Sequence, residues 1–211
     1  MRLTPAHIPV GYSGTGAGVA GGNSFTDTIP TDANCTVIWV GYITAASAPT
    51  ISAQLGSNSA VAQATSTVAS AINAYLTAFT VINPPSGVQT ITFNATGLSA
   101  YCIVETVHYK NVASIGAPVI LSDQTGATCL ISADNTTPNA MYANAFSYRG
   151  TSGQTFVGYN QTQRFLAADV TNSNEPIVIG DAPGNGATLT FSATRSNNYT
   201  WGGIIIPFLP L

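Results

Sequence analysis

The stretch that decides the fold lies between residues 81 and 93 and reads Val81-Ile82-Asn83-Pro84-Pro85-Ser86-Gly87-Val88-Gln89-Thr90-Ile91-Thr92-Phe93. It joins the end of an apolar segment, a turn rich in Pro and Gly, and a segment that alternates between two faces. In that last segment Val88, Thr90 and Thr92 alternate with Gln89, Ile91 and Phe93. A period of two is the pattern of a β-strand, and Pro and Gly mark the turn between strands. The stretch therefore predicts two antiparallel strands.

Similar segments recur along the whole chain, and we expect about a dozen strands with almost no helix. Residues Thr36–Ile43 form a continuous apolar run, which predicts a central strand buried on both faces. The Ala-rich stretch Ser59–Ala74 contains β-branched residues but no Leu, Glu or Lys, so we interpret it as loop and edge strand. Because strands follow strands, the sheets should be antiparallel. We find no fixed-period repeat of the solenoid or propeller kind.

Only 6% of the residues are charged, and the net charge is −3. An ordinary soluble domain has about 25% charged residues. Five Lys and Arg residues cannot line a phosphate backbone or an anionic membrane surface, so we expect no nucleic-acid partner and no membrane insertion. The apolar runs are also too short for a spanning helix. A surface that carries so little charge favours contact with other subunits, with copies of the chain or with glycan.

The N-terminal segment 1–9 has no apolar core of a secretory signal, so we expect a protein made in the cytoplasm. The cysteines fit that compartment. They are odd in number, widely spaced and each set in an apolar run, which predicts buried thiols: Cys35, Cys102 and Cys129.

The motifs that carry chemistry are weak. A GxGxxG pattern at residues 16–21 precedes a strand pattern, not the helix that a dinucleotide site needs, so it is interpreted as a hairpin loop or a subunit-contacting arm. His108 has no second histidine near it in sequence and is interpreted as an edge or interface residue. Glu105 stands in mid-strand, facing either water or a buried partner such as Arg. We therefore expect no catalytic residues, no metal site and no cofactor, and no enzyme.

Aromatic residues beside Asn and Gln cluster in the second half of the chain. Exposed aromatic side chains of this kind favour sugar binding or a protein interface, whereas the alternative is ordinary packing in a sandwich core. The candidate residues for a glycan or subunit contact are Tyr142, Tyr148, Tyr159 and Trp201.

Taken in order, four segments resemble a jelly-roll domain of tailed-phage virion proteins, of the concanavalin-like lectin/glucanase architecture. These segments are 22–30, 37–42, 81–93 and 107–112, and the strand, N-P-x-x-G turn and strand of residues 81–93 are the most similar. The resemblance covers most of residues 9–207. It implies a single jelly-roll β-sandwich over residues 23–211, preceded by a Gly-rich arm and first strand in residues 1–22.

The resemblance also implies a function. We expect a virion protein, namely a minor tail, tail-tip or fibre subunit of actinobacteriophage type, with a head decoration protein as the nearest variant. The alternative from another class is a carbohydrate-binding module for host cell-surface glycan. We expect a homo-oligomer, as a trimer or a larger virion ring, in which residues 1–22 or the C-terminal strand 204–211 contact copies of the chain or other virion proteins.

Overall fold

The computed structural model describes residues 8–16, 19–20, 23–134, 136–149, 154–167, 175–195 and 198–211. In these residues the regular structure is β-strand, apart from one short 3-10 turn, η1 (Ser70–Ile72). The all-β, antiparallel prediction is confirmed, although the strands are more numerous than the dozen expected.

The described residues of the first half form the strands β1 (Gly11–Thr15), β2 (Val19–Ala20), β3 (Ser24–Ile29), β4 (Cys35–Thr44), β5 (Ile51–Leu55), β6 (Asn58–Ser59), β7 (Val61–Ala69), β8 (Ala74–Ile82), β9 (Gly87–Ala95) and β10 (Leu98–Lys110). Those of the second half form β11 (Val112–Ile115), β12 (Val119–Gln124), β13 (Thr128–Ala133), β14 (Met141–Tyr148), β15 (Phe156–Tyr159), β16 (Thr162–Ala167), β17 (Ile177–Pro183), β18 (Leu189–Arg195) and β19 (Trp201–Pro210).

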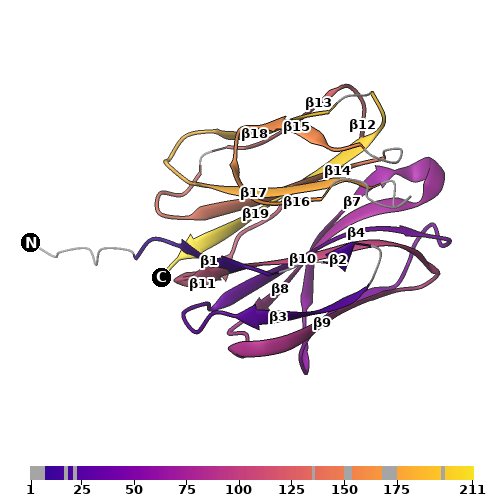
Figure 1. Cartoon of the computed structure of the whole chain (residues 1–211). Coiled ribbons are helices and arrows are strands. Elements are labelled where there is room, and N and C mark those ends of the chain that lie inside the picture. Colours follow the sequence, from indigo (N-terminus) through magenta and orange to yellow (C-terminus); the bar gives the residue numbers. More distant parts are fainter. Residues whose placement is uncertain are drawn as a thin grey trace, which may run out of the picture.

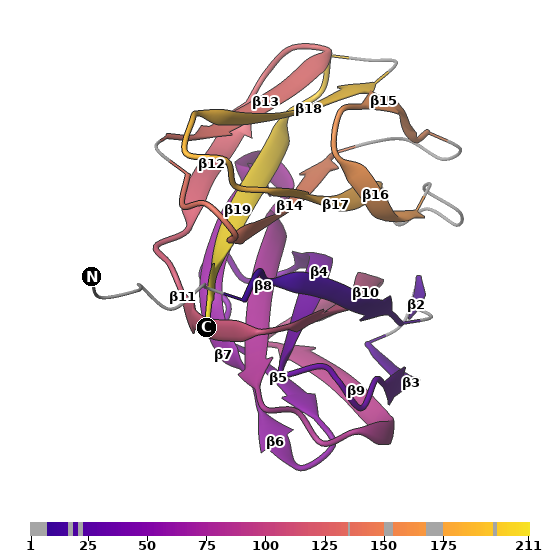
Figure 2. The same cartoon turned by 90° about the vertical axis from the view of Figure 1, so that its left-hand side faces the viewer.

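The strands form four sheets stacked in layers (Figures 1 and 2). Sheet A has the order β1-β10-β4-β8-β7, with β2 also beside β10, and sheet B has the order β3-β9-β5-β6. Sheet C has the order β11-β19-β14-β17-β16, with β12 also beside β19, and sheet D has the order β13-β18-β15. The layers follow one another as B, A, C and D, so sheets A and C lie inside the stack (Figure 1).

The same topology occurs twice. If β1 with β2, β6 with β7, and β11 with β12 are each counted as one interrupted strand, both halves have eight strands in the same order. In sheets A and C the first strand pairs with the eighth, the eighth with the third and the third with the sixth; in sheets B and D the order is second, seventh and fourth. In the first half the fifth strand is divided into β6, which stays in sheet B, and β7, which joins sheet A. This strand order is that of a jelly roll. The structure thus differs from the single sandwich predicted for residues 23–211, because sheets A and B form one jelly roll and sheets C and D a second.

The register of the strands identifies equivalent residues in the two jelly rolls. A β-bulge lies between Ala62 and Ala64 of β7 and another between Gln163 and Phe165 of β16, at the same position opposite the neighbouring strand. When residues are matched outward from these two bulges through the strand pairing, Tyr42 of β4 occupies the same position as Tyr148 of β14. Strands β9 and β18 share the sequence Thr-(Ile/Leu)-Thr-Phe-x-Ala-Thr, at residues 90–96 and 188–194. These matches point to an internal duplication.

Equivalent residues meet each other where sheet A packs on sheet C. The rings of Tyr109 and Phe208, which are equivalent by register, pack against each other in a tilted arrangement with centroids 4.8 Å apart. A Cβ placed on Gly41 would lie 3.8 Å from Oγ of its equivalent, Ser147. Contacts between equivalent residues are the property of a two-fold interface. The two jelly rolls are therefore related by a pseudo-two-fold axis between sheets A and C.

Three apolar cores separate the four layers, and strand β4 shows why its sequence is apolar on both faces. Ile38 and Val40 face the core between sheets A and B, whereas Val37 and Trp39 face the core between sheets A and C. The prediction of a central, doubly buried strand at Thr36–Ile43 is confirmed. The three cysteines are free thiols buried in these cores, as predicted.

The segments expected at subunit contacts are placed within the chain itself. Where the N-terminal arm is described, β1 and β2 pair with β10 in sheet A; residues 1–7, 17–18 and 21–22 lie outside the described part. The C-terminal strand β19 is paired on both sides, and Ile204, Ile206 and Phe208 are fully buried. Of the C-terminal strand 204–211, only residues 209–211 are not buried, so the contact expected there, which stays a prediction, would involve that end of the strand.

Candidate functional site

The four aromatic residues predicted to contact glycan or subunits do not form one surface. Tyr142, Tyr148 and Trp201 are buried in the core between sheets C and D, where Tyr148 packs edge-to-face on Phe156. The hydroxyl of Tyr142 accepts a hydrogen bond from the backbone N–H of Thr137. Only Tyr159 has an exposed side chain. These aromatics therefore serve core packing, with Tyr159 as the one that can reach a partner.

A buried acid, histidine and hydroxyl come together between sheets A and B. Nε2 of His108 lies 2.9 Å from Oδ2 of Asp27, and Nδ1 lies 3.0 Å from Oγ1 of Thr36. Thr106 donates a second hydrogen bond to the same oxygen of Asp27, at 2.6 Å. Burial tends to raise the pKa of Asp27, but the contacts with His108 and Thr106 hold it below its ordinary value. The sequence had suggested an edge or interface position for His108, whereas the structure places it inside.

This cluster has the residue types of a nucleophilic triad but not its accessibility. Thr36 and His108 are at most 1% exposed, so no substrate reaches the hydroxyl. The first glycine of the GxGxxG pattern, Gly16, lies against the cluster, since a Cβ there would come within 2.8 Å of the Asp27 carboxyl. The described part of that pattern continues into β2 and then β3, with no helix. We interpret the cluster as a polar link that fastens β3 to β10 and β4.

A second polar cluster links the two jelly rolls. The guanidinium of Arg164 donates from Nε and Nη2 to the two oxygens of Asp181, both at 2.8 Å. The Tyr109 hydroxyl donates to Oδ2 of Asp181 at 3.1 Å, and the Arg164 guanidinium lies 3.7 Å from the ring centre of Tyr12. Tyr12 and Tyr109 belong to sheet A, and Arg164 and Asp181 to sheet C. Sequence reasoning missed this cluster, because its four residues come from four different strands in both halves of the chain: β1, β10, β16 and β17.

The third polar group is the buried carboxyl of Glu175. Glu175 precedes β17 and is 1% exposed, and neither of its carboxyl oxygens has a hydrogen-bond partner in the described residues. Burial raises the pKa of Glu175 well above its ordinary value. A Cβ on Gly41 would lie 3.6 Å from Oε2 of Glu175, which places the carboxyl between sheets A and C. Glu105 is also buried there and accepts a hydrogen bond from the N–H of Thr106.

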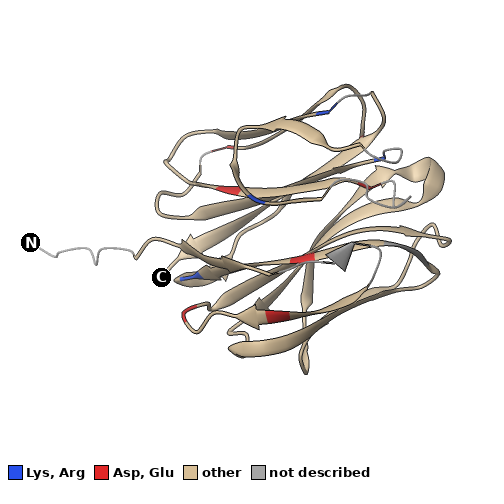
Figure 3. Ribbon diagram, in the orientation of Figure 1, with Lys and Arg blue, Asp and Glu red and all other residues tan. Residues whose placement is uncertain are grey.

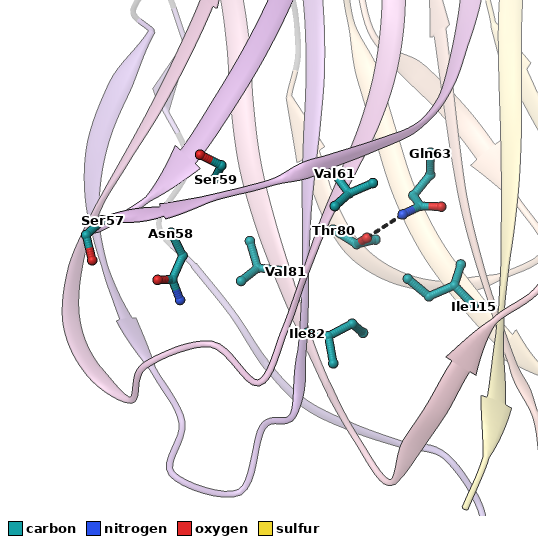
Figure 4. Close-up of a pocket in the computed structure, with 9 residues that line it drawn as sticks. All are labelled: Ser57, Asn58, Ser59, Val61, Gln63, Thr80, Val81, Ile82 and Ile115. Carbon is teal, nitrogen blue, oxygen red and sulfur yellow. Dashed lines mark hydrogen bonds between the residues drawn. The ribbon is translucent and has the colours of Figure 1, made fainter.

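A pocket of about 490 Å³ opens at the edge of the stack, where β6 leads into β7 (Figure 4). Its nine lining residues are all uncharged: Ser57, Asn58, Ser59, Val61, Gln63, Thr80, Val81, Ile82 and Ile115. They come from the turn before β6, from β6, β7 and β8 of the first jelly roll and from β11 of the second half. Gln63 donates a hydrogen bond from Nε2 to Oγ1 of Thr80 at 2.7 Å.

By register, this pocket contains the pseudo-symmetric counterpart of the Arg164 cluster. Gln63 is equivalent to Arg164, since both are the extra residue of their bulge, and Thr80 is equivalent to Asp181. Ile115 pairs with Phe208 as Tyr12 pairs with Tyr109, so Ile115 is equivalent to Tyr12. At these three positions the first jelly roll therefore has shorter, neutral side chains, whereas the second has the charged Arg164 cluster.

Charged residues are few along the ribbon (Figure 3), and several of them are buried. Asp27, Glu105, Glu175, Asp181 and Arg195 are all buried. Within the described ranges no three His, Cys, Asp or Glu residues are grouped as metal ligands would be. No helix among those residues has the length and apolar character of a membrane span.

Comparison with known proteins gives no relative for this arrangement. No protein-family model matches the chain, and no curated protein and no solved structure matches it.

Proposed function

We propose that this chain is a structural subunit of a tailed-phage virion, in a minor tail, tail-tip or fibre position, and that it assembles as a homo-oligomer. A head decoration protein is the variant of the same role. The observation that carries the proposal is the distribution of charge on a pair of stacked jelly rolls. The chain uses several of its few charged groups for internal links, which leaves a surface composed mainly of hydroxyl, amide and aliphatic groups.

The outer faces of the stack support this role. On sheet D the exposed residues include Leu130 and Val157, and on sheet B they include Val88, surrounded by Ser and Thr. Ser24 and Thr92 on sheet B are matched by Ser132 and Thr190 on sheet D, as hydroxyl pairs joined across neighbouring strands. The centre of a protein interface is poor in charged residues, so such faces suit permanent contact with neighbouring subunits.

The buried polar clusters support a structural role in preference to catalysis. The set of Asp27, His108 and Thr36 has no route for a substrate, and the pair of Arg164 and Asp181 is occupied in joining sheets A and C. Both clusters connect layers, which gives the stack rigidity at the cost of solvation of the buried charges.

The test is to locate the chain on particles. Antibodies raised against the purified chain should label intact phage particles made from the genome that encodes it, and negative-stain microscopy should place the label on the tail. Label on the capsid would support the decoration variant. Particles that carry no label, although the chain is abundant in the same lysate, would overturn the virion role.

Assembly can be tested separately by sedimentation of the purified chain. We expect an oligomer that dissociates when Leu130 and Val157 are both changed to Lys, because two charges would enter an apolar contact. The control is Gln163→Lys, at an exposed position on β16, the edge strand of sheet C, away from the outer face of sheet D. A monomer at every concentration, in the unchanged chain, would contradict assembly of the chain on its own.

A further inference from the structure

The pocket beside Gln63 is the open member of a duplicated site, and we propose that it binds a neutral sugar, as a mono- or disaccharide unit of a glycan. The inference does not depend on the virion role. It begins from the pseudo-two-fold axis, which relates Gln63, Thr80 and Ile115 to Arg164, Asp181 and Tyr12.

The Arg164 cluster is the closed member of the duplicated site, because side chains fill the space that forms the pocket in the first jelly roll. Arg164 extends between the Tyr12 ring and the Asp181 carboxylate, so its own side chain occupies the position between the jelly rolls. In the open member Gln63 is shorter and its partner Thr80 is smaller, while an aliphatic residue replaces the tyrosine ring. A volume of about 490 Å³ is left, which lies in the usual range for small-molecule sites.

The polar groups of the pocket select the class of ligand. The side chains of Ser57, Asn58 and Ser59 make no hydrogen bond with any described residue, so their donors and acceptors are available. On the facing wall, Gln63 keeps its amide oxygen after donating to Thr80. Amides and hydroxyls on two sides suit a ligand with several hydroxyls of its own. No charged residue lines the pocket, so an ionic ligand would be desolvated without a counter-charge.

The apolar groups fit the same class. Val61 and Ile82 are 62% and 44% exposed, and they lie beside Thr80 in the pocket (Figure 4). A sugar ring presents C–H groups on its faces and hydroxyls at its rim. Its face can therefore cover these two aliphatic side chains while its rim bonds to Asn58 and Gln63. Covering them removes apolar surface from water, which favours binding.

The experiment is a titration of the full-length chain, followed by two-dimensional NMR of its backbone amides. The neutral probes are cellobiose, maltose, lactose and N,N′-diacetylchitobiose, and the charged probes are glucuronic acid and sialyllactose. We expect at least one neutral probe to bind with a dissociation constant on the order of 1 mM and to shift the signals of Asn58, Gln63 and Thr80. The charged probes should bind more weakly.

Two variants and a control make the result specific. Gln63→Arg combined with Thr80→Asp copies the closed member into the pocket, and should weaken binding by about tenfold or more. Asn58→Ala changes the opposite wall and provides a second test if the double variant does not fold. The control is Gln163→Ala, an exposed Gln on the equivalent strand β16, which should leave binding unchanged. The proposal is overturned if no neutral probe shifts pocket signals, if a charged probe binds as well, or if the folded pocket variants bind as the unchanged chain does.

Discussion

Replacing Glu175 with Gln should make the protein more stable at neutral pH. The Glu175 carboxyl is buried between sheets A and C without a hydrogen-bond partner in the described residues. The ionisable groups coupled to it are Tyr42 and Cys102, whose pKa values are raised mainly by burial, and Glu105 is buried in the same layer. Burial is the cause of the raised pKa of Glu175, so its neutral form is favoured in the folded chain.

The direction of the pH effect follows from linkage. The ordinary pKa of this carboxyl is 4.5, and the folded pKa is raised well above that value. Between these two values the folded chain holds a proton that the unfolded chain has lost, so the free energy of unfolding falls as the pH rises. Within this pH range the loss approaches about 1.4 kcal/mol per pH unit, once the unfolded carboxyl is fully ionised. Glu175→Gln keeps the shape and removes the titration.

Urea unfolding at pH 4.5, 5.5 and 6.5 measures this difference. The two proteins should have similar stability at pH 4.5, and the variant should gain over the unchanged chain by up to about 1.4 kcal/mol at each further unit. The control is Asp134→Asn, at an exposed carboxylate, which should give a curve parallel to that of the unchanged chain. If Glu175→Gln is equally or less stable at pH 6.5, the carboxyl is ionised and paired, and the reasoning is refuted.

Three further predictions concern the layers. Ile38→Asp would put a charge into the core between sheets A and B, which should lower the free energy of unfolding by several kcal/mol. Recovery of a soluble variant with an unchanged β-sheet circular dichroism spectrum would contradict the position of β4. Asp181→Asn leaves Arg164 without its charge partner and should cost about 3–5 kcal/mol in urea unfolding, and a loss below 1 kcal/mol would show that the link is unimportant. The cysteines of the folded chain should not react with a thiol reagent at pH 8, because burial shields them and raises their pKa values, to about 12 for Cys35 and Cys129. Fast labelling of the folded chain would contradict their burial.

The strands could be predicted because a local pattern in the sequence marks each of them. The run at Thr36–Ile43 is apolar without interruption, which is the pattern of a strand covered on both faces, and β4 is covered by sheets B and C. The turn at residues 83–87 joins β8 to β9 as the Pro and Gly residues indicate. Asn83 and Gly87 there both have a positive φ, which these residue types tolerate.

The duplication could not be predicted, because most equivalent positions hold different residues. Trp39 and Gly41 of β4 correspond to Ala145 and Ser147 of β14, so a large residue beside a small one in the first jelly roll is replaced by two small residues in the second. Cores conserve total volume and pattern more than identity. The shared segment at residues 90–96 and 188–194 was the one signal in the sequence that could have revealed it.

The candidate aromatics were misplaced for a related reason. The Asn and Gln residues near these aromatics suggested exposed side chains, with Tyr142 and Tyr148 available to a ligand. Sheet C, however, lies between sheets A and D, so both faces of β14 are buried. An exposed face and a buried face of β14 can be distinguished only when it is known that sheet D covers that face. The pocket at Gln63 was missed because its polar residues, taken singly, are typical of any turn or edge strand.

The virion role is tested most directly by the composition of purified particles. Phage made from the genome that encodes the chain should be banded in a density gradient, and its proteins quantified by mass spectrometry. The proposal predicts that the chain bands with the particles in a fixed ratio to the major tail protein, at every salt concentration that leaves the particles intact. A chain that remains in the soluble fraction, while complete particles band without it, would contradict the proposal.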